Sequence, residues 1–516
     1  MVRMCTRGLY GTVVAPWQQA LGDAVVTDTP VIRLCWSEDG VVINGSASQF
    51  TARLVVVAVP LGVLKHWCAE GTPEVLTPDL PACLAGPISR LGFGTENKVT
   101  LCFDADSTVA LLLKDRDIMM TDDARFRRWV KGGDARTVFC FDTAAQDGSD
   151  VADEDRAVTA EKANVVLHRM LGISDADVKP PAAYHVTRWQ DDMYARGAYS
   201  YMRAGSTIAD FHALGEHHSQ ECPSLVFAGE HCLSEKNPSE GTMHSAIMSG
   251  VHAAELALDS DQLGGEWTRS EYTHDVIVVG GGLAGLSAAS VLKDNGRSTL
   301  RVALIEAKSQ CGGRVCSGTC GATGEKTLAK LQASTVNEQE EQGGSRKSKR
   351  RKRAAASESA AALPPTVDFG ASFVMGEFVG ALRQARPSQE LERGDEVRGV
   401  NVKGAWLSSS AVKVDVKVNK RKIPAVEVNK AKKALETLVA KACSYGSRDL
   451  PIGAEDSFGA ALDRAKTSDV VERVSYDAGI LNTMLRYEFA YVCTPDELSL
   501  KGVKDTVALK GIKDAV

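Results

Sequence analysis

Residues 1–110 alternate short apolar runs with turn residues, a pattern that predicts β-strands. Leu54–Val59 is continuously apolar and ends at Pro60, which is typical of a strand that is buried on both faces. Helical periodicity appears at residues 155–172 and from about Thr242 to Leu258. Further strands are predicted at Val25-Val26, Val31–Trp36, Val41–Ile43, Asn97–Phe103, Ala183–Trp189 and Leu225–Ala228.

A new pattern begins after residues 259–272, which are polar and contain glycine and are therefore expected to form a linker. Val276–Val279 predicts a strand, Leu286–Lys293 a helix and Val302–Glu306 a second strand. Together they form a βαβ unit of about 30 residues, the length at which dinucleotide-binding domains begin. Further helices are expected at Val428–Ser444 and Ala478–Tyr491.

Residues 324–363 show no periodicity and are highly polar, so a disordered insertion is expected there. Within it, Arg346–Arg353 holds seven basic residues in eight. Such a run is typical either of a nuclear localisation signal or of a solvated charge run in a loop. We therefore expect a nuclear or a cytoplasmic protein.

The composition of the 516-residue chain is that of a globular protein with two or three domains. The net charge of −6 predicts neither a nucleic-acid partner nor a membrane surface, and no stretch approaches the roughly 20 apolar residues of a membrane span. The 13 cysteines include no CxxC pair. Hence we expect no metal site and a reducing compartment.

The glycines after the strand at Val276–Val279 carry the first chemical signal. Gly280, Gly282 and Gly285 form G-x-G-x-x-G, in which the glycines allow a tight turn, the approach of a pyrophosphate and close helix–strand packing. Glu306 closes the next strand, 21 residues after Gly285, where a carboxylate can accept hydrogen bonds from ribose hydroxyls. The sequence therefore predicts a dinucleotide-binding domain.

Gly312-Gly313-Arg314 follows six residues after Glu306 and would add backbone N–H groups and a cation beside the pyrophosphate. With this segment, the chain resembles the flavin-containing amine oxidases, and most closely the lysine-specific histone demethylases and polyamine oxidases. The segment Asp368–Ser372 resembles the part of the family sequence that passes along the flavin ring. The resemblance implies FAD rather than NAD.

The remaining family motifs lie near the N-terminus. They are Pro60–Lys65, Leu91–Val99 with Lys98, Arg188-Trp189, Tyr194–Tyr201 and the Gly229-Glu230-His231 segment. Residues 1–258 thus resemble the later half of the family sequence, and residues 274–516 resemble its earlier half. A circular permutation explains this order, and so does a chain that spans two tandem gene copies.

The resemblance implies an α/β fold with a Rossmann-like FAD-binding domain and a mixed α+β substrate domain. The FAD-binding domain would take residues 1–90, 223–258 and 273–380, and the substrate domain residues 91–222 and 381–510. Lys98 would be catalytic, Tyr199 and Tyr201 would contact the substrate, and His231 and His244 would be structural. Non-covalent FAD would be bound by Gly280, Gly282, Gly285, Glu306, Lys308, Gly312, Gly313, Arg314, Gly370, Ala371, Ser372, Val31, Pro60, Trp189, Gly229, Glu230, Thr242 and Met243.

The implied reaction is hydride transfer from a secondary amine of the polyamine type to the flavin, which yields an imine, then an aldehyde and an amine, and hydrogen peroxide from O₂. Histone N-methyl-lysine demethylation is the alternative, and an inactive interaction protein of the same fold is another. Asn237 precedes Pro238 where the demethylases and polyamine oxidases have a tyrosine, and no acidic cluster follows Leu498–Lys501. We expect a small amine or a methyl-lysine peptide as partner, and no coiled-coil corepressor.

Overall fold

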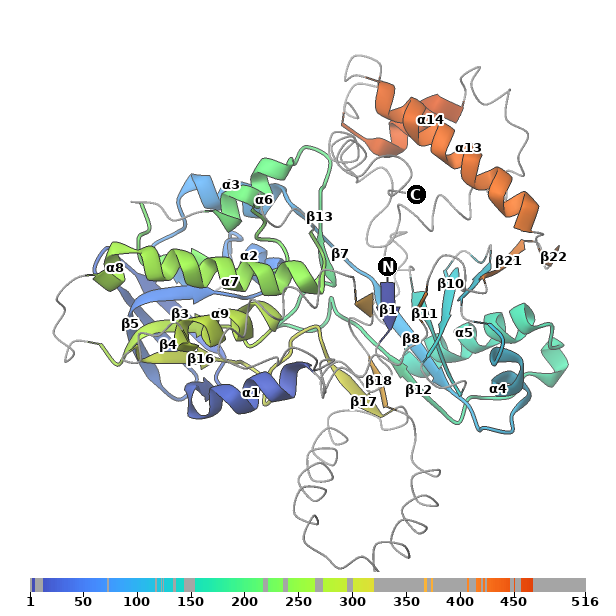
Figure 1. The fold of residues 1–516 in the computed structure, drawn as a ribbon, viewed down its shortest axis with the longest axis horizontal. Helices are drawn as coiled ribbons and strands as arrows, with labels where there is room; N and C mark the ends of the chain where they lie inside the picture. The colour runs from blue at the N-terminus through green and yellow to red at the C-terminus, as the bar shows by residue number, and fades with distance from the viewer. Residues whose placement is uncertain are drawn as a thin grey trace, which may run out of the picture.

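Two large β-sheets, each with its own helices, organise the described part of the protein (Figure 1). The computed structural model describes residues 2–4, 13–71, 74–116, 118–121, 123, 125–132, 136–142, 154–216, 221–234, 240–264, 272–294, 300–319, 366–368, 373–374, 406–407, 414–418, 421–422, 425–445, 450 and 456–466.

The larger sheet has eight strands in the order β2-β16-β15-β5-β4-β3-β6, with β14 paired to the end of β5. The two halves of the sequence meet at its centre, because β5 and β15 pair in parallel from Ala52↔His274 to Val57↔Val279. The strands are β2 (Val25–Val26), β3 (Val31–Trp36), β4 (Val41–Gly45), β5 (Gln49–Val57), β6 (Leu76–Thr77), β14 (Leu225–Phe227), β15 (His274–Val279) and β16 (Val302–Ile305).

Both faces of this sheet are buried, as the continuous apolar runs predict. Because side chains alternate along a strand, Val276 and Val278 belong to one hydrophobic core, and Ile277 and Val279 belong to the other. The helices α1 (Ala15–Leu21), α7 (Met243–Asp259) and α9 (Leu283–Asp294) supply the first core, whereas α2 (Leu61–Trp67), α3 (Ala82–Arg90) and α6 (Ile208–Gly215) supply the second.

Helices α7 and α9 come from different halves of the sequence and pack closely. A Cβ atom at Gly250 would lie 2.0 Å from Ser287 Oγ and 2.1 Å from the Ala284 carbonyl oxygen, so only glycine fits there. The Ser287 hydroxyl donates to the carbonyl of Ile247 at 2.9 Å. This contact fixes the dinucleotide-type helix against the helix that follows Thr242.

The smaller sheet has seven strands in the order β12-β8-β11-β10-β9-β21-β22. Helices α4 (Thr108–Leu113) and α5 (Arg156–Leu171) cover one face, and Trp129 and Leu167 lie in the core between them. The strands are β8 (Asn97–Cys102), β9 (Ile118–Thr121), β10 (Arg128–Lys131), β11 (Thr137–Asp142), β12 (Ala183–Val186), β21 (Val414–Val418) and β22 (Arg421–Lys422).

Smaller elements complete the described part of the chain. Strands β7 (Gly92–Gly94) and β13 (Tyr199–Tyr201) pair with each other, and Leu263 of α8 (Asp261–Gly264) is buried in the first core. The others are β1 (Val2–Met4), β17 (Ser317–Thr319), β18 (Thr366–Asp368), β19 (Phe373–Val374), β20 (Trp406–Leu407), α13 (Ala425–Ser444), α14 (Phe458–Lys466) and the 3₁₀ turns Gly22–Ala24 and Asp175–Asp177.

The predicted strands are confirmed within a few residues, but the expectation of strands alone before residue 110 is wrong. Helix α2 begins directly after Pro60, because its carbonyl accepts from the amides of Val63 and Leu64 at 2.9 and 3.1 Å. An apolar run of four residues looks the same in a buried strand and in a short buried helix. Helix α3 was not predicted because it contains Pro87 in its interior, and proline usually ends a helix.

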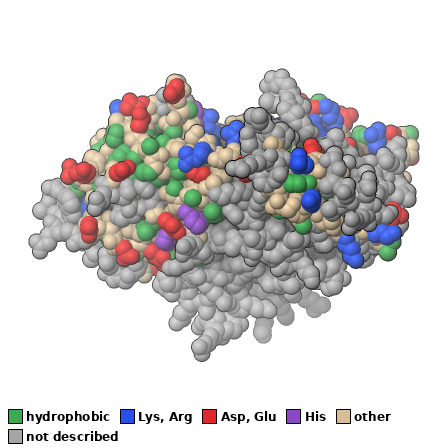
Figure 2. Space-filling model, turned by 90° about the horizontal axis from the view of Figure 1, so that it is seen from above, with side chains coloured by type: hydrophobic (Ala, Val, Ile, Leu, Met, Phe, Trp, Pro, Cys, Tyr) green, Lys and Arg blue, Asp and Glu red, His purple; other side chains and the backbone are tan. Residues whose placement is uncertain are grey.

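The expectation for residues 259–272 needs a similar correction at its start, because α7 extends to Asp259 and α8 follows immediately. The predicted helix at Ala478–Tyr491 and the insertion at 324–363 lie outside the described residues. No described helix has the length and hydropathy that a membrane crossing requires. Charges of both signs are scattered over the coloured part of the face in Figure 2.

Candidate active site

A cavity of about 1440 Å³ extends from the carboxyl ends of β5, β15 and β16 to β8, β10 and β11 of the smaller sheet. Residues from both halves of the sequence line it, among them Lys98, Glu230 and Glu306. Open α/β sheets bind ligands at the carboxyl ends of their strands. The cavity therefore lies where the fold predicts a dinucleotide.

The turn between β15 and α9 has the geometry that G-x-G-x-x-G requires. Gly280 has φ of +108°, and a Cβ atom there would lie 2.7 Å from the Ala58 carbonyl oxygen. A Cβ atom at Gly285 would lie 1.9 Å from the Gly280 carbonyl oxygen. Gly282 differs, since a Cβ atom there would meet nothing within 4 Å. The fold thus needs Gly280 and Gly285, while Gly282 faces open space.

Glu306 is held at the end of β16 by two backbone amides. Oε2 accepts from Gly281 N at 2.7 Å, and Oε1 accepts from Lys308 N at 2.9 Å. Burial raises the pKa of Glu306 above its usual value, although these two amides oppose the rise. Each carboxylate oxygen keeps a free lone pair, so both can accept from a ribose diol.

Arg314 joins the two halves of the cavity wall. Its Nη1 donates to Glu230 Oε1 at 2.9 Å and to the Ala198 carbonyl at 2.7 Å. Gly282 and Gly312 form an isolated parallel bridge, which brings the Gly-Gly-Arg segment beside the first turn of α9. Lys308 forms an ion pair with Asp192, which also joins the two halves of the sequence.

Glu230 is buried, with a side chain only 5 % exposed, at the centre of this junction. Its Oε2 accepts from the Ser200 hydroxyl at 2.5 Å and from Gly241 N at 3.0 Å. Burial by itself raises the pKa of Glu230, but Arg314 and the Ser200 hydroxyl outweigh burial and lower it below its usual value. Glu230 is therefore a carboxylate at neutral pH.

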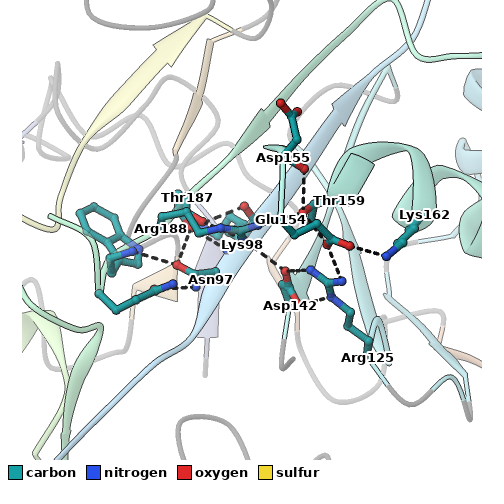
Figure 3. Close-up of polar contacts among 12 residues, drawn as sticks. Asn97, Lys98, Arg125, Asp142, Glu154, Asp155, Thr159, Lys162, Thr187 and Arg188 are labelled. Atoms are coloured by element: carbon teal, nitrogen blue, oxygen red, sulfur yellow. Dashed lines mark hydrogen bonds and ion pairs between the residues drawn. The ribbon is translucent and has the colours of Figure 1, made fainter. Parts of the chain in front are cut away.

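Lys98 is buried in the cavity wall, on a strand whose end is fixed by side-chain hydrogen bonds (Figure 3). Its backbone N donates to Thr187 Oγ1 at 2.7 Å, and Asn97 Oδ1 accepts from Trp189 N at 2.9 Å. Its Nζ lies 4.6 Å from the centroid of the Phe139 ring. The two hydrogen bonds fix the start of β8 against the segment after β12, and Phe139 of β11 lies beside Nζ.

A network of ion pairs lies at the end of β11, next to α5 and the segment after β12 (Figure 3). Arg125 donates to both oxygens of Asp142, at 2.7 and 2.8 Å, and to Glu154 at 2.7 Å. Arg188 lies 3.4 Å from Asp142 and donates to Thr159 Oγ1 at 2.8 Å. The network ties β11 to α5 and to the segment that carries Trp189.

One carboxyl group and three aromatic side chains complete this part of the cavity wall. Tyr199 donates its hydroxyl to Glu96 Oε2 at 3.1 Å, and Tyr201 and Trp189 also line the cavity. Glu96 and Arg128 are cavity residues that the sequence did not single out. The available signal was nearness in sequence, because Glu96 stands two residues before Lys98, in the segment that leads into β8.

The cavity brings together nearly all described residues that the sequence assigned to FAD or substrate. The exception is Gly285, which is buried beneath the turn; Gly370, Ala371 and Ser372 lie outside the described residues. The lining includes Val31, Pro60, Lys98, Trp189, Tyr199, Tyr201, Gly229, Glu230, Thr242, Met243, Gly280, Gly282, Glu306, Lys308, Gly312, Gly313 and Arg314.

The two histidines have different surroundings. His231 is fully buried, and neither ring nitrogen has a hydrogen-bond partner among the described residues. Burial lowers the pKa of His231 to about 4, so the ring is neutral at physiological pH. His244 lies in the first turn of α7, two residues after the N-cap Thr242, and lines the cavity. The Thr242 hydroxyl accepts from Ser245 N at 3.2 Å.

These residues fit FAD on grounds of geometry and chemistry. Gly282 leaves room for a phosphate beside the N-terminal amides of α9, which have no partner within the helix. Glu306 presents acceptors for a ribose one strand away. Arg314 follows Gly312-Gly313, and the bridge between Gly282 and Gly312 joins this segment to the glycine turn.

Comparison with protein families gives the decisive observation. The model of the flavin containing amine oxidoreductases matches residues 1–258, half of the chain. The chain belongs to this family. A second model, of NAD(P)-binding Rossmann-like domains, matches residues 278–342, which confirms the α/β fold class. The Rossmann-like match follows the amine oxidoreductase match, the order that the motif positions predict. The cofactor that the family implies is FAD.

Individual relatives include histone demethylases and a polyamine oxidase. Lysine-specific histone demethylase 1 homolog 2 of Oryza sativa subsp. japonica is 31 % identical over 265 residues, with 46 % of this chain and 32 % of that protein covered. Polyamine oxidase 2 of Arabidopsis thaliana is 30 % identical over 210 residues, with 41 % of this chain and 40 % of that protein covered. The chain thus spans less than half the length of these curated relatives.

Solved structures of putrescine oxidase also match. One of them is 20 % identical at a TM-score of 0.36, with 47 % of this chain and 51 % of that chain covered.

Proposed function

We propose that this protein is an FAD-dependent oxidase of a secondary amine, with a polyamine as the substrate class. The observation that carries the proposal is the single cavity in which the dinucleotide end, marked by Glu306, is continuous with the Lys98 end. Family membership and the 30 % identity to a polyamine oxidase support it. FAD would be bound without a covalent bond.

The bound flavin would supply the two-electron oxidation of the amine and the transfer of those electrons to O₂. The chain would bind the pyrophosphate at Gly282 and Arg314 and the adenosine ribose at Glu306. Lys98, whose position is fixed by the contacts of β8, would orient a water molecule beside the reacting groups. Tyr199, Tyr201 and Trp189 would surround the alkyl chain of the substrate.

Demethylation of an N-methyl-lysine peptide is the second candidate. The similarity to histone demethylases supports it, at 31 % identity for the rice relative. Against it stands the stretch after Lys501, because residues 502–516 contain no acidic cluster. The basic run at Arg346–Arg353 would direct either enzyme to the nucleus; otherwise the protein is cytoplasmic.

The test uses the purified full chain, loaded with FAD. We expect flavin absorbance that bleaches when spermine is added without oxygen, and peroxide when air is admitted. A dimethyl-lysine histone H3 peptide is run beside spermine, and bleaching by the peptide alone supports the demethylase. A protein that binds no FAD, or whose flavin neither substrate bleaches, supports the inactive interaction protein.

A matched variant separates cofactor binding from folding. Gly282→Ala places a methyl group in open space, so we expect the apoprotein to unfold at the same temperature as the wild type. Because that space is proposed for the pyrophosphate, FAD affinity should fall at least about 100-fold. Equal FAD affinity of the variant and the wild type would exclude a pyrophosphate at this turn.

A further inference from the structure

Glu96 is a buried carboxyl group in the cavity, between β7 and β8, to which the proposed function assigns no role. Its side chain is 10 % exposed, and its Oε1 accepts no hydrogen bond from any described residue. A buried carboxylate oxygen without a donor is costly, so such groups in native proteins usually meet a ligand or water. Oε1 itself is closed off from solvent, so among the described residues its charge is balanced by the Arg128 ion pair rather than by a hydrogen bond.

Three groups from three strands face this carboxyl group. Tyr199 of β13 donates its hydroxyl to Oε2 at 3.1 Å, and Arg128 of β10 places Nη2 at 3.8 Å from Oε1. Lys98 of β8 is close enough to act on it electrostatically. The Arg128 guanidinium also lies over the Phe141 ring, 4.0 Å from its centroid, so its position is fixed.

These surroundings bring the proton equilibrium of Glu96 into the neutral range. Burial raises the pKa of Glu96 to about 7, even though Arg128, Tyr199 and Lys98 all lower it. At neutral pH, the group is therefore present in both the charged and the neutral form. A carboxyl group with these properties is suited to general acid–base work.

The substrate has a complementary requirement. An alkyl amine is an ammonium ion in water, since its pKa is about 10, as for lysine. Its nitrogen then has no lone pair, and oxidation of the neighbouring carbon needs the neutral amine. We propose that Glu96 accepts the proton of the substrate ammonium group inside the cavity, with Tyr199 positioning the carboxylate. This role rests on the proposed amine oxidation.

The step balances without any further reactant. One N–H bond of the ammonium group breaks, its electron pair stays on nitrogen, and an O–H bond forms on Glu96. A carboxylate and an ammonium ion become a carboxylic acid and an amine, so the net charge of the cavity does not change. The neutral pair has the smaller desolvation cost in a buried cavity, which favours the transfer.

The experiment compares wild-type protein with Glu96→Gln, both as full chains loaded with FAD, and spermine as substrate. In the wild type, kcat/KM should rise with pH through an apparent pKa near 7. In the variant, this step should vanish, kcat/KM should rise only with the fraction of neutral amine, and activity at pH 7 should fall about 100-fold. Glu161→Gln, at an exposed position of α5, is the matched control and should behave like the wild type.

Two further readouts distinguish a proton acceptor from a structural group. Tyr199→Phe removes a hydrogen bond that lowers the pKa of Glu96, so the step in kcat/KM should move to higher pH. Infrared difference spectra should show a protonated carboxyl band that disappears as the pH rises through 7 and that is missing in Glu96→Gln.

The outcomes separate this role from the proposed function. If Glu96→Gln oxidises spermine with the wild-type pH profile, Glu96 is not the proton acceptor, although the enzyme remains an amine oxidase. If the wild type binds FAD but oxidises neither spermine nor the methyl-lysine peptide, the proposed function fails, and this role fails with it.

Discussion

The two ends of the cavity are built in opposite ways. At the dinucleotide end, one continuous segment from β15 to β16 supplies Gly280, Gly282 and Glu306, and backbone amides hold the carboxylate. At the other end, Lys98, Tyr199 and Glu230 come from separate segments, and side-chain ion pairs and hydroxyls hold them. A local motif can fix the first end, whereas the second exists only when distant strands have paired.

From this comparison we predict that substitutions at the dinucleotide end destabilise the protein through steric clashes. Gly285→Ala should destabilise the protein by roughly 4 kcal/mol or more, because the new methyl group would stand 1.9 Å from a backbone carbonyl that cannot move aside. Thermal unfolding of the apoprotein measures the effect. Gly282→Ala is the control at the same turn, and equal stability of the two variants would contradict the steric explanation.

At the other end, substitutions should destabilise the protein by breaking ion pairs. Asp142→Asn leaves Arg125 and Arg188 without their shared carboxylate, and a broken buried ion pair costs about 3 kcal/mol. Urea unfolding checks this value. The matched control is Asp175→Asn, which breaks the exposed pair with Arg169 and should change the free energy of unfolding far less, because water screens that pair. A similar loss in both variants would mean that burial of the network adds nothing.

Arg314 belongs to both ends, so its variant tests whether they are coupled. Arg314→Met leaves Glu230 buried without its cation, and we expect a loss of about 2 kcal/mol together with weaker FAD binding. Because Arg314 lowers the pKa of Glu230, that pKa should rise in the variant. Calorimetry with and without FAD measures the change in stability and the change in FAD affinity. Normal FAD affinity in the variant would show that FAD binding does not depend on the Arg314–Glu230 ion pair.

Glu96 gives the smallest and most pH-dependent effect. Since its folded pKa of about 7 exceeds the usual 4.5, its contribution to stability is fully present below pH 4.5 and is lost as the pH rises through 7. Glu96→Gln removes this dependence, so relative to the wild type the variant should gain about 2 kcal/mol between pH 5 and pH 8. Urea unfolding at the two pH values tests it. A constant difference would show that Glu96 is not protonated in the folded state.

His231 contributes with the opposite sign. Its folded pKa of about 4 lies below the usual 6.5, so the stability that it contributes is present above pH 6.5 and is lost as the pH falls through 4. Experiments on Glu96 are therefore best confined to pH 5 and above, where only part of the His231 contribution has been lost.

Several features of the site followed from local sequence alone. The strand before Gly280 and the acid at Glu306 predicted a dinucleotide turn, because the steric demands of that turn are met within one βαβ unit. The resemblance of the Lys98 and Glu230 segments to known motifs added the chemistry. The short helices α2 and α3 were missed, since four apolar residues or an internal proline give no helical period.

The sequence by itself determined the strands, the glycine turn and the family, because each depends on residues close together in the chain. Only the tertiary structure decided that β5 and β15 are neighbours, and that Arg314 therefore reaches Glu230. It alone shows that Glu96 is buried beside Arg128 and Tyr199, which shifts its pKa. The physical reason is that burial and ion pairing depend on contacts between distant segments, and no local pattern records them.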